Sequence, residues 1–137
     1  MVVDASVWVS YFLPGDRFHA GTEAWLEAAM REERALAAPS LLLPEVAGAV
    51  ARRSGSPDLG VEAAERLRNL PTLNLVPLGE ELVRLSVEVA ATLPVRGADA
   101  LYIATAQLLR VPLVTWDAEQ RARGGLVVPT HSPGDPS

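Results

Sequence analysis

The chain has 137 residues, 49% of them hydrophobic, with a formal net charge of −5 and no cysteine. This composition predicts one globular domain with a sizeable core, and it excludes disulfides, thiolate nucleophiles and cysteine-ligated zinc. All twelve basic residues are Arg, so a P-loop and Schiff-base chemistry, which both need Lys, are excluded. An acidic chain of this kind does not bind nucleic acid through bulk charge, and such binding would need local Arg clusters or bridging metal ions.

The predicted elements alternate between strands and helices along the chain. Strands are expected at residues 1–3, 35–38, 73–78, 112–116 and 126–128. Helices are expected at residues 5–12, 18–34, 40–53, 58–70, 80–93 and 98–109, with a short one beginning at Asp117. Ser40 and Asp58 are the expected N-caps of the third and fourth helices.

This alternation favours a parallel sheet covered by helices on both faces. We therefore expect a single-domain α/β fold, a three-layer sandwich, over residues 1–130, followed by a flexible C-terminal tail over residues 131–137.

No targeting or membrane segment is expected. The N-terminus has no basic region ahead of its apolar residues, and Asp4 interrupts them, which argues against a secretory signal. The longest apolar tract, residues 35–51, contains Pro39, Pro44 and Glu45, so no segment should span a membrane. We expect a cytoplasmic protein with no membrane partner.

Four acidic residues interrupt apolar sequence: Asp4, Glu45, Asp99 and Asp117. Asp4 and Asp117 each follow a predicted parallel strand, whereas Glu45 and Asp99 lie in the first turns of predicted helices. The carboxyl ends of parallel strands and the starts of the following helices meet at one edge of a sheet, where ligands bind in open α/β folds. We therefore expect the four carboxylates around one shallow site.

Each acid also has a structural explanation. The three Asp residues are suitable helix N-caps, each stabilising by roughly 1 kcal/mol, and Glu45 has Arg52 and Arg53 as possible ion-pair partners. Four carboxylates in one site, however, repel one another unless some are protonated or a cation neutralises them. Hard oxygen ligands without Cys point to Mg²⁺ or Mn²⁺ rather than zinc.

Four segments resemble, in order, the four acidic blocks of PIN domains: residues 2–6 (VVDAS), 39–46 (PSLLLPEV), 97–106 (GADALYIATA) and 114–117 (VTWD). Their order and spacing are most similar to those of VapC-type toxins from prokaryotic toxin–antitoxin pairs, and the resemblance covers residues 1 to about 129. It implies a five-stranded parallel sheet in the strand order 3-2-1-4-5, with Asp4 on the central strand.

The resemblance also implies an endoribonuclease that depends on Mg²⁺ or Mn²⁺ and acts as the toxin of a type II toxin–antitoxin system. The four acids are then the catalytic and metal-binding residues, with Ser6 and Thr115 in supporting positions. Asp4 and Asp99 are expected to hold metal directly. For Glu45 and Asp117 three roles stay open, namely direct binding of the metal, action through water, or orientation of the attacking water, and the number of metal ions is open as well. The implied partners are RNA, a cognate antitoxin protein and a second copy of the chain.

Further residues are candidates for substrate or partner binding. Arg96, just ahead of Asp99, is placed to contact a phosphate or to restrain the carboxylate. Trp8 and Trp116 are candidates to stack on bases or to pack in the core. We expect the antitoxin on helices 18–34 and 40–53, through Trp25 and residues 41–43, and the dimer contact on residues 80–93 and 101–109.

Three other functional classes compete with the nuclease. The first alternative is a catalytically silent PIN-like scaffold that mainly binds a partner protein. We rank it second because all four acids are present. A phosphatase of the haloacid dehalogenase type also begins with an Asp after a strand but needs a second Asp two residues later, where this chain has Ser6. A dinucleotide-binding domain needs a Gly-rich turn after the first strand, and residues 5–13 contain no Gly.

Overall fold

A computed structural model describes residues 1–135 of the chain. Within them, five strands form one sheet in the order β3-β2-β1-β4-β5, and every neighbouring pair is parallel. This confirms the predicted strand number, direction and order. The strands are β1 (Val2–Val3), β2 (Leu36–Pro39), β3 (Leu73–Val76), β4 (Leu113–Val114) and β5 (Thr130–His131).

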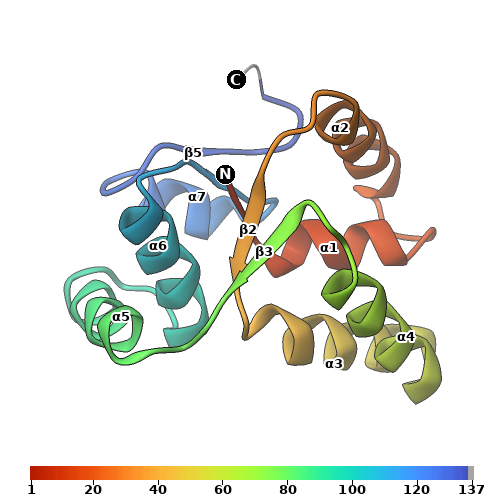
Figure 1. The fold of residues 1–137 in the computed structure, drawn as a ribbon, viewed down its shortest axis with the longest axis horizontal. Helices are drawn as coiled ribbons and strands as arrows, with labels where there is room; N and C mark the ends of the chain where they lie inside the picture. Colours follow the sequence, from red (N-terminus) through yellow and green to blue (C-terminus); the bar gives the residue numbers. More distant parts are fainter. Residues whose placement is uncertain (136–137) are drawn as a thin grey trace.

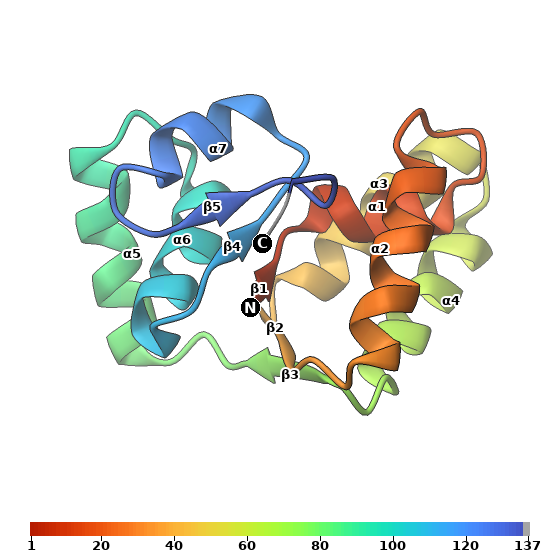
Figure 2. The same cartoon turned by 90° about the horizontal axis from the view of Figure 1, so that it is seen from above.

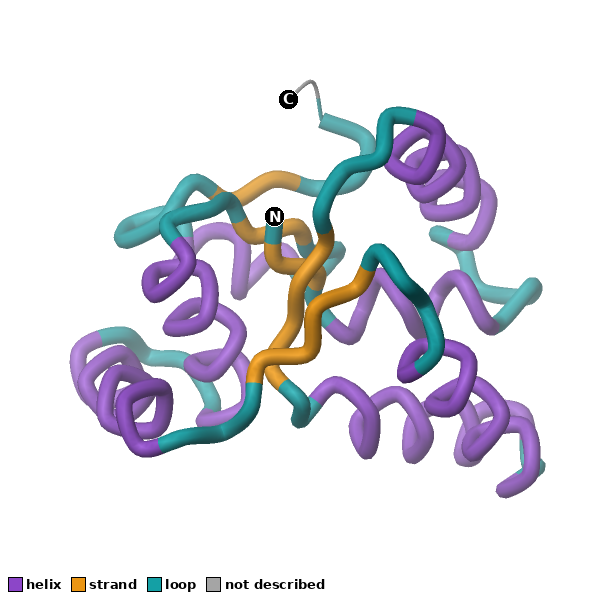
Figure 3. Tube along the Cα trace, in the orientation of Figure 1, coloured by secondary structure: helices purple, strands orange, loops and turns teal. Residues whose placement is uncertain are grey.

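Helices cover both faces of this sheet, as predicted for a three-layer sandwich. In two perpendicular views, α1 to α4 lie on one side and α5 to α7 on the other (Figures 1 and 2). The short strands form a narrow central band between these two layers (Figure 3). The helices are α1 (Ala5–Phe12), α2 (His19–Arg31), α3 (Leu42–Ser54), α4 (Pro57–Arg68), α5 (Glu80–Thr92), α6 (Gly97–Leu109) and α7 (Ala118–Gly124).

The core is built around β1 and α6. Val2 and Val3 on the central strand are completely buried, because a parallel sheet with helices on both faces exposes neither side of its middle strands to water. In α6 the run from Tyr102 to Ala106 is also buried. Asp4 therefore directly follows a completely buried strand at the centre of the core.

The starts of two helices differ from the prediction. Ser40 does not cap α3: its N–H extends the sheet by donating to the Val76 carbonyl oxygen at 2.8 Å, and the helix begins two residues later, at Leu42, without a side-chain cap. In α4 the N-cap is Ser56, whose hydroxyl accepts from the N–H of Leu59. Asp58 lies in the first helical turn instead, where its charge complements the helix dipole.

The predicted fifth strand at residues 126–128 is wrong. The N–H groups of these residues donate to carbonyl oxygens of Arg123 and Gly124 and so close the end of α7, leaving none for strand pairing. The fifth strand is Thr130–His131, so His131, assigned above to the tail, pairs with Val114 in the sheet. Residues 136 and 137 of the expected tail lie outside the described residues.

In the part of the chain that the structure describes, no helix combines the length and the apolar character needed to cross a membrane.

Candidate active site

An open cleft of about 810 Å³ brings together all four acids singled out in the sequence: Asp4, Glu45, Asp99 and Asp117. Asp4 follows the central strand, and Asp117 follows β4, which pairs directly with β1. Glu45 and Asp99 come from the first turns of α3 and α6. Residues separated by more than a hundred positions thus meet at the carboxyl edge of the sheet, where open α/β folds bind ligands.

Asp4 is buried at the bottom of this arrangement, with 6% of its surface exposed. Its Oδ2 atom accepts hydrogen bonds from the Ser6 N–H at 3.0 Å and from the Thr115 hydroxyl at 3.1 Å. Burial raises the pKa of Asp4, and these hydrogen bonds offset part of that rise. Asp4 does cap α1, but the cap leaves a carboxylate in an environment that opposes its charge.

Ser6 and Thr115 connect the segments that follow β1 and β4, beside this carboxylate. Their hydroxyl oxygens lie 3.3 Å apart. The Ser6 hydroxyl accepts from the Trp116 N–H at 3.1 Å, and that of Thr115 accepts from the Asp117 N–H at 3.0 Å. These two residues therefore fix the backbone that carries Asp117 relative to Asp4.

Glu45 makes a contact that the sequence did not reveal. Its Oε1 atom accepts a hydrogen bond of 2.6 Å from the hydroxyl of Tyr102, which is 1% exposed. Burial raises the pKa of Glu45, the Tyr102 hydroxyl lowers it in part, and the nearby charges of Asp4 and Asp99 raise it further. The proposed ion pair of Glu45 with Arg52 or Arg53 is absent among the described residues, and Arg53 pairs with Asp16 at 2.8 Å instead.

Tyr102 is held neutral by the same surroundings. Burial, followed by the negative charges of Asp4 and Glu45, raises the pKa of its hydroxyl far above the ordinary value. It therefore acts only as a hydrogen-bond donor to Glu45. A signal for this role was present in the sequence: Tyr102 is three residues after Asp99 in a helix, a spacing that places two side chains on one face.

Asp99 is not a helix cap. The N-cap of α6 is Arg96, and no side chain caps this end. The Asp99 Oδ2 atom lies 3.6 Å from Nε of Arg96, whose side chain is 83% exposed, so the pair is screened by water. Burial and the charge of Asp4 raise the pKa of Asp99, and Arg96 offsets only part of that rise.

Asp117, in contrast, has a complete structural role. Its Oδ1 atom accepts from the N–H groups of Glu119 and Gln120, both at 2.9 Å, and thereby caps α7. The capping interpretation is thus correct for Asp4 and Asp117 and wrong for Asp99. Capping accounts for the position of Asp117, but it does not explain why three further carboxylates share its cleft.

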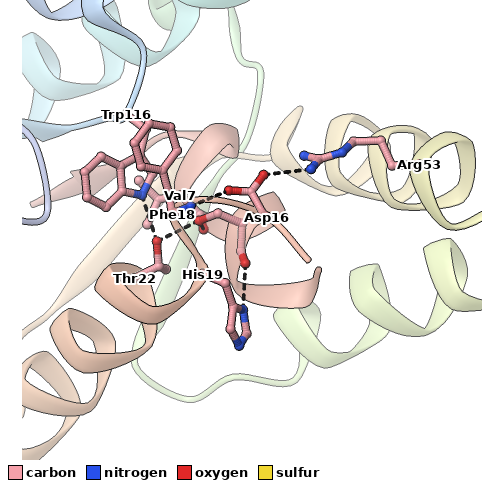
Figure 4. Close-up of polar contacts among 8 residues, drawn as sticks. Val7, Asp16, Phe18, His19, Thr22, Arg53 and Trp116 are labelled. Atoms are coloured by element: carbon pink, nitrogen blue, oxygen red, sulfur yellow. Dashed lines mark hydrogen bonds and ion pairs between the residues drawn. The ribbon is translucent and has the colours of Figure 1, made fainter. Parts of the chain in front are cut away.

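Two aromatic residues, Phe18 and Trp116, line this cleft, and their side chains lie next to each other (Figure 4). Phe18 stacks on Trp116 with ring centroids 4.3 Å apart and an interplanar angle of 7°. The Trp116 Nε1 atom donates to the Thr22 hydroxyl at 2.7 Å, and this hydroxyl lies 2.6 Å from that of the buried Ser10. Trp116 therefore fixes α2 to the loop after β4, whereas Trp8 is a core residue that is 1% exposed.

The donor set of the cleft suits a hard divalent cation. Its carboxylates raise one another's pKa values, as for Glu45 and Asp99, and a bound cation offsets such repulsion. Among residues 1–135, no three His, Asp or Glu side chains already form a group that can hold a metal ion. Mg²⁺ retains several waters and is commonly bound by one or two carboxylates together with substrate phosphates, so the residues present fit such an ion.

Fold and site together define a class: an open parallel α/β domain with a carboxylate-lined cleft at the carboxyl edge of its sheet. The family follows from the sequence comparison. The chain belongs to the PIN-domain family, whose model matches residues 1–126. No curated protein matches the chain significantly.

Several solved structures share the fold at low sequence identity. The toxin VapC20 of Mycobacterium tuberculosis, described as cleaving the sarcin–ricin loop, has a TM-score of 0.74 and 17% identity over 88% of this chain and 92% of that one. A toxin–antitoxin complex from Klebsiella pneumoniae has a TM-score of 0.68 and 21% identity over 98% of each chain. FitAcB from Neisseria gonorrhoeae has a TM-score of 0.72 and 18% identity over 96% of each chain.

Proposed function

We propose that this protein is an endoribonuclease that depends on Mg²⁺ or Mn²⁺, and that it acts as the toxin of a type II toxin–antitoxin system in the cytoplasm. The observation that carries the proposal is the convergence of four carboxylates in one cleft of a PIN fold. Three of them, Asp4, Glu45 and Asp99, have raised pKa values. Crowding of this kind is unfavourable for the protein alone and favourable when a cation is bound.

The side chains have distinct roles in this proposal. Asp4 and Asp99 hold the metal ion, while Glu45 and Asp117 bind it directly or through water. When bound, the ion lowers the pKa of a water molecule and offsets the charge that develops on the scissile phosphate. Tyr102 occupies one oxygen of Glu45, so this carboxylate offers its other oxygen to the cleft.

Arginine side chains are the proposed phosphate contacts. Arg17, Arg52 and Arg96 all line the cleft that holds the carboxylates. Each is mostly exposed, and Arg forms bidentate hydrogen bonds with phosphate oxygens. They supply local positive charge at the cleft of a chain whose net charge is −5.

The toxin assignment adds two protein partners. One structure with this fold is described as a toxin–antitoxin complex and another as a toxin, which supports a cognate antitoxin for this chain. We keep α2 and α3 as its proposed docking surface, with the exception of Leu42, which is completely buried. For the homodimer contact we retain residues 80–93, where Val83 and Val87 are 43% and 61% exposed and lie on one helical face. The other predicted part, residues 101–109, is wrong over Tyr102–Ala106, because this run is buried inside the protein.

Calorimetric titration with Mn²⁺ is the first test. The wild type is compared with Asp99→Asn, which removes a charge from the cleft while keeping the side-chain shape. Asp58→Asn is the matched control, because Asp58 is also an acid in the first turn of a helix but is exposed on α4. We expect Mn²⁺ binding by the wild type and the control, and its loss in the folded Asp99→Asn protein.

The same variants test the reaction. Incubation with bacterial ribosomal and transfer RNA in Mn²⁺ should give discrete fragments with the wild type and the control, and none with Asp99→Asn or after chelation of the metal. Absence of Mn²⁺ binding by the wild type would contradict the nuclease proposal. The second candidate, a catalytically silent scaffold that binds a partner protein, would then take its place.

A further inference from the structure

Gln120 is a buried residue whose polar groups lack partners. It lies in the first turn of α7, and only 1% of its surface is exposed. Neither Oε1 nor Nε2 makes a hydrogen bond of good geometry with the described residues. Buried amide atoms without partners destabilise a folded protein, so an apolar side chain would fill this position more favourably in the protein alone.

The surroundings of Gln120 belong to the acidic site. Its carboxamide lies beside the carboxylate of Asp4 and acts, with Ser6 and Thr115, to lower the pKa of that group. It also lines a smaller cleft of about 320 Å³, which it shares with Asp99 and Arg96. This cleft is large enough for water molecules. The unpartnered amide is therefore next to one proposed metal ligand and shares a cleft with another.

Gln107 provides an internal comparison. Its Oε1 atom is also buried without a partner, but this residue lies on α6 beside Val111 and Pro112, in a cleft that contains none of the four acids. A missing partner is thus not in itself a sign of a site. What distinguishes Gln120 is that both of its amide atoms lack partners next to the carboxylates.

We propose that Gln120 is a positioning residue of the metal site: when the ion is bound, its amide nitrogen completes a hydrogen bond to Asp4, and its amide oxygen accepts one from a water in the hydration shell of the ion. An amide suits both tasks, because it offers a donor and an acceptor without adding charge. This inference rests on the proposed metal-dependent function and identifies a residue outside the four acidic blocks. It also explains why a destabilising side chain occupies this position.

The test uses Gln120→Met in the full-length protein, because Met has a similar length and shape but no amide. Thermal unfolding without metal should show an unchanged or higher Tm, with a rise of about 7 °C if each of the two unpaired groups costs about 1 kcal/mol. Calorimetry should show a Kd for Mn²⁺ about tenfold higher than that of the wild type, a typical loss for a residue behind a metal ligand. Gln107→Met is the control and should leave this Kd unchanged.

The two measurements together separate positioning from packing. A Gln120→Met protein that binds Mn²⁺ as tightly as the wild type would overturn this inference and leave the proposed nuclease intact. A wild type that binds no Mn²⁺ would overturn both. If Gln120→Met is poorly folded, Gln120→Leu provides the same comparison, with Gln107→Leu as its control.

Discussion

The hydroxyl of Tyr102 offers a quantitative test of the electrostatics of the site. Tyr102→Phe removes one oxygen and leaves the ring in a pocket that is 1% exposed. The hydrogen bond that is lost is 2.6 Å long and its acceptor is the Glu45 carboxylate. Bonds to charged groups contribute about 1.5–3 kcal/mol, and we expect about 1.5 kcal/mol here because Glu45 is only half-buried and water can replace the phenol.

This free energy corresponds to a measurable change in melting temperature. Globular proteins gain about 2.1 cal/mol/K of entropy per residue on unfolding, which gives about 290 cal/mol/K for a chain of this size. A loss of about 1.5 kcal/mol therefore lowers Tm by about 5 °C. The assay is thermal unfolding followed by circular dichroism in metal-free buffer.

The loss should also depend on pH. The folded-state pKa of Glu45 is raised by burial, and the Tyr102 hydroxyl holds part of that rise back, so removing the hydroxyl raises this pKa further. The loss of stability in Tyr102→Phe is then largest at pH values where Glu45 is ionised. It becomes smaller as the pH falls through the raised pKa of this group. The difference in Tm should be larger at pH 8 than at pH 4.5.

Tyr11→Phe is the control for this experiment. Tyr11 lies on α1, where its ring packs edge-on against Phe12 and beside the guanidinium of Arg66. An equal loss of Tm in Tyr11→Phe, or a loss in Tyr102→Phe that does not change with pH, would refute the assignment of a charged hydrogen bond to Glu45.

Three further predictions concern charge and packing. The metal-free protein should lose stability as the pH rises from about 4.5 to 8, because three crowded carboxyl groups have raised pKa values and the folded state holds more protons than the unfolded state. Urea unfolding at several pH values measures this, and the free energy of unfolding should depend less on pH in Asp99→Asn. Added Mn²⁺ should raise Tm more at pH 8 than at pH 5, since it binds ionised carboxylates. Thr22→Val leaves Trp116 Nε1 without a partner, while the Ser10 hydroxyl keeps its hydrogen bond to the Val7 carbonyl oxygen, so urea unfolding should show a loss of about 1–3 kcal/mol.

Each of these has an outcome that contradicts it. A metal-free stability that increases steadily up to pH 8, with the same slope in Asp99→Asn, would mean that the carboxylates do not repel one another in the folded protein. An Mn²⁺ effect that is equal at both pH values would mean that the ion binds elsewhere. If Thr22→Val is as stable as the wild type, water or a rearranged side chain satisfies Trp116.

The order of the elements and the chemistry of the site were accessible from local sequence patterns. The apolar run ahead of Asp4, the alternation of strands and helices, and the apolar character of residues 98–109 predicted a covered parallel sheet. Asp4 and Asp117 were placed at one edge because each follows a parallel strand. Such predictions succeed because hydrophobic periodicity and the ends of elements depend on neighbours in the chain.

Some errors arose where local patterns allowed two outcomes. Leu126, Val127 and Val128 have strand-forming character, yet their N–H groups close the end of α7 and the strand forms two residues later. Asp99 has the residue type of an N-cap, yet α6 begins ahead of it at Gly97. Both outcomes depend on where a neighbouring element places its hydrogen-bonding groups.

The environment of each carboxylate was decided by tertiary structure alone. Tyr102 meets Glu45 across 57 positions of the chain, and Gln120 becomes buried beside Asp4 only when α7 packs against the edge of the sheet. The spacing of Tyr102 from Asp99 placed it on the face of the acidic site, but no local pattern identifies the partner of Tyr102 or of Gln120, because long-range packing determines which side chains lose water and which find partners. The sequence by itself determined which acids the protein has and at which edge of the sheet they gather. The packed fold determined how far burial and neighbouring charges raise the pKa of each carboxyl group.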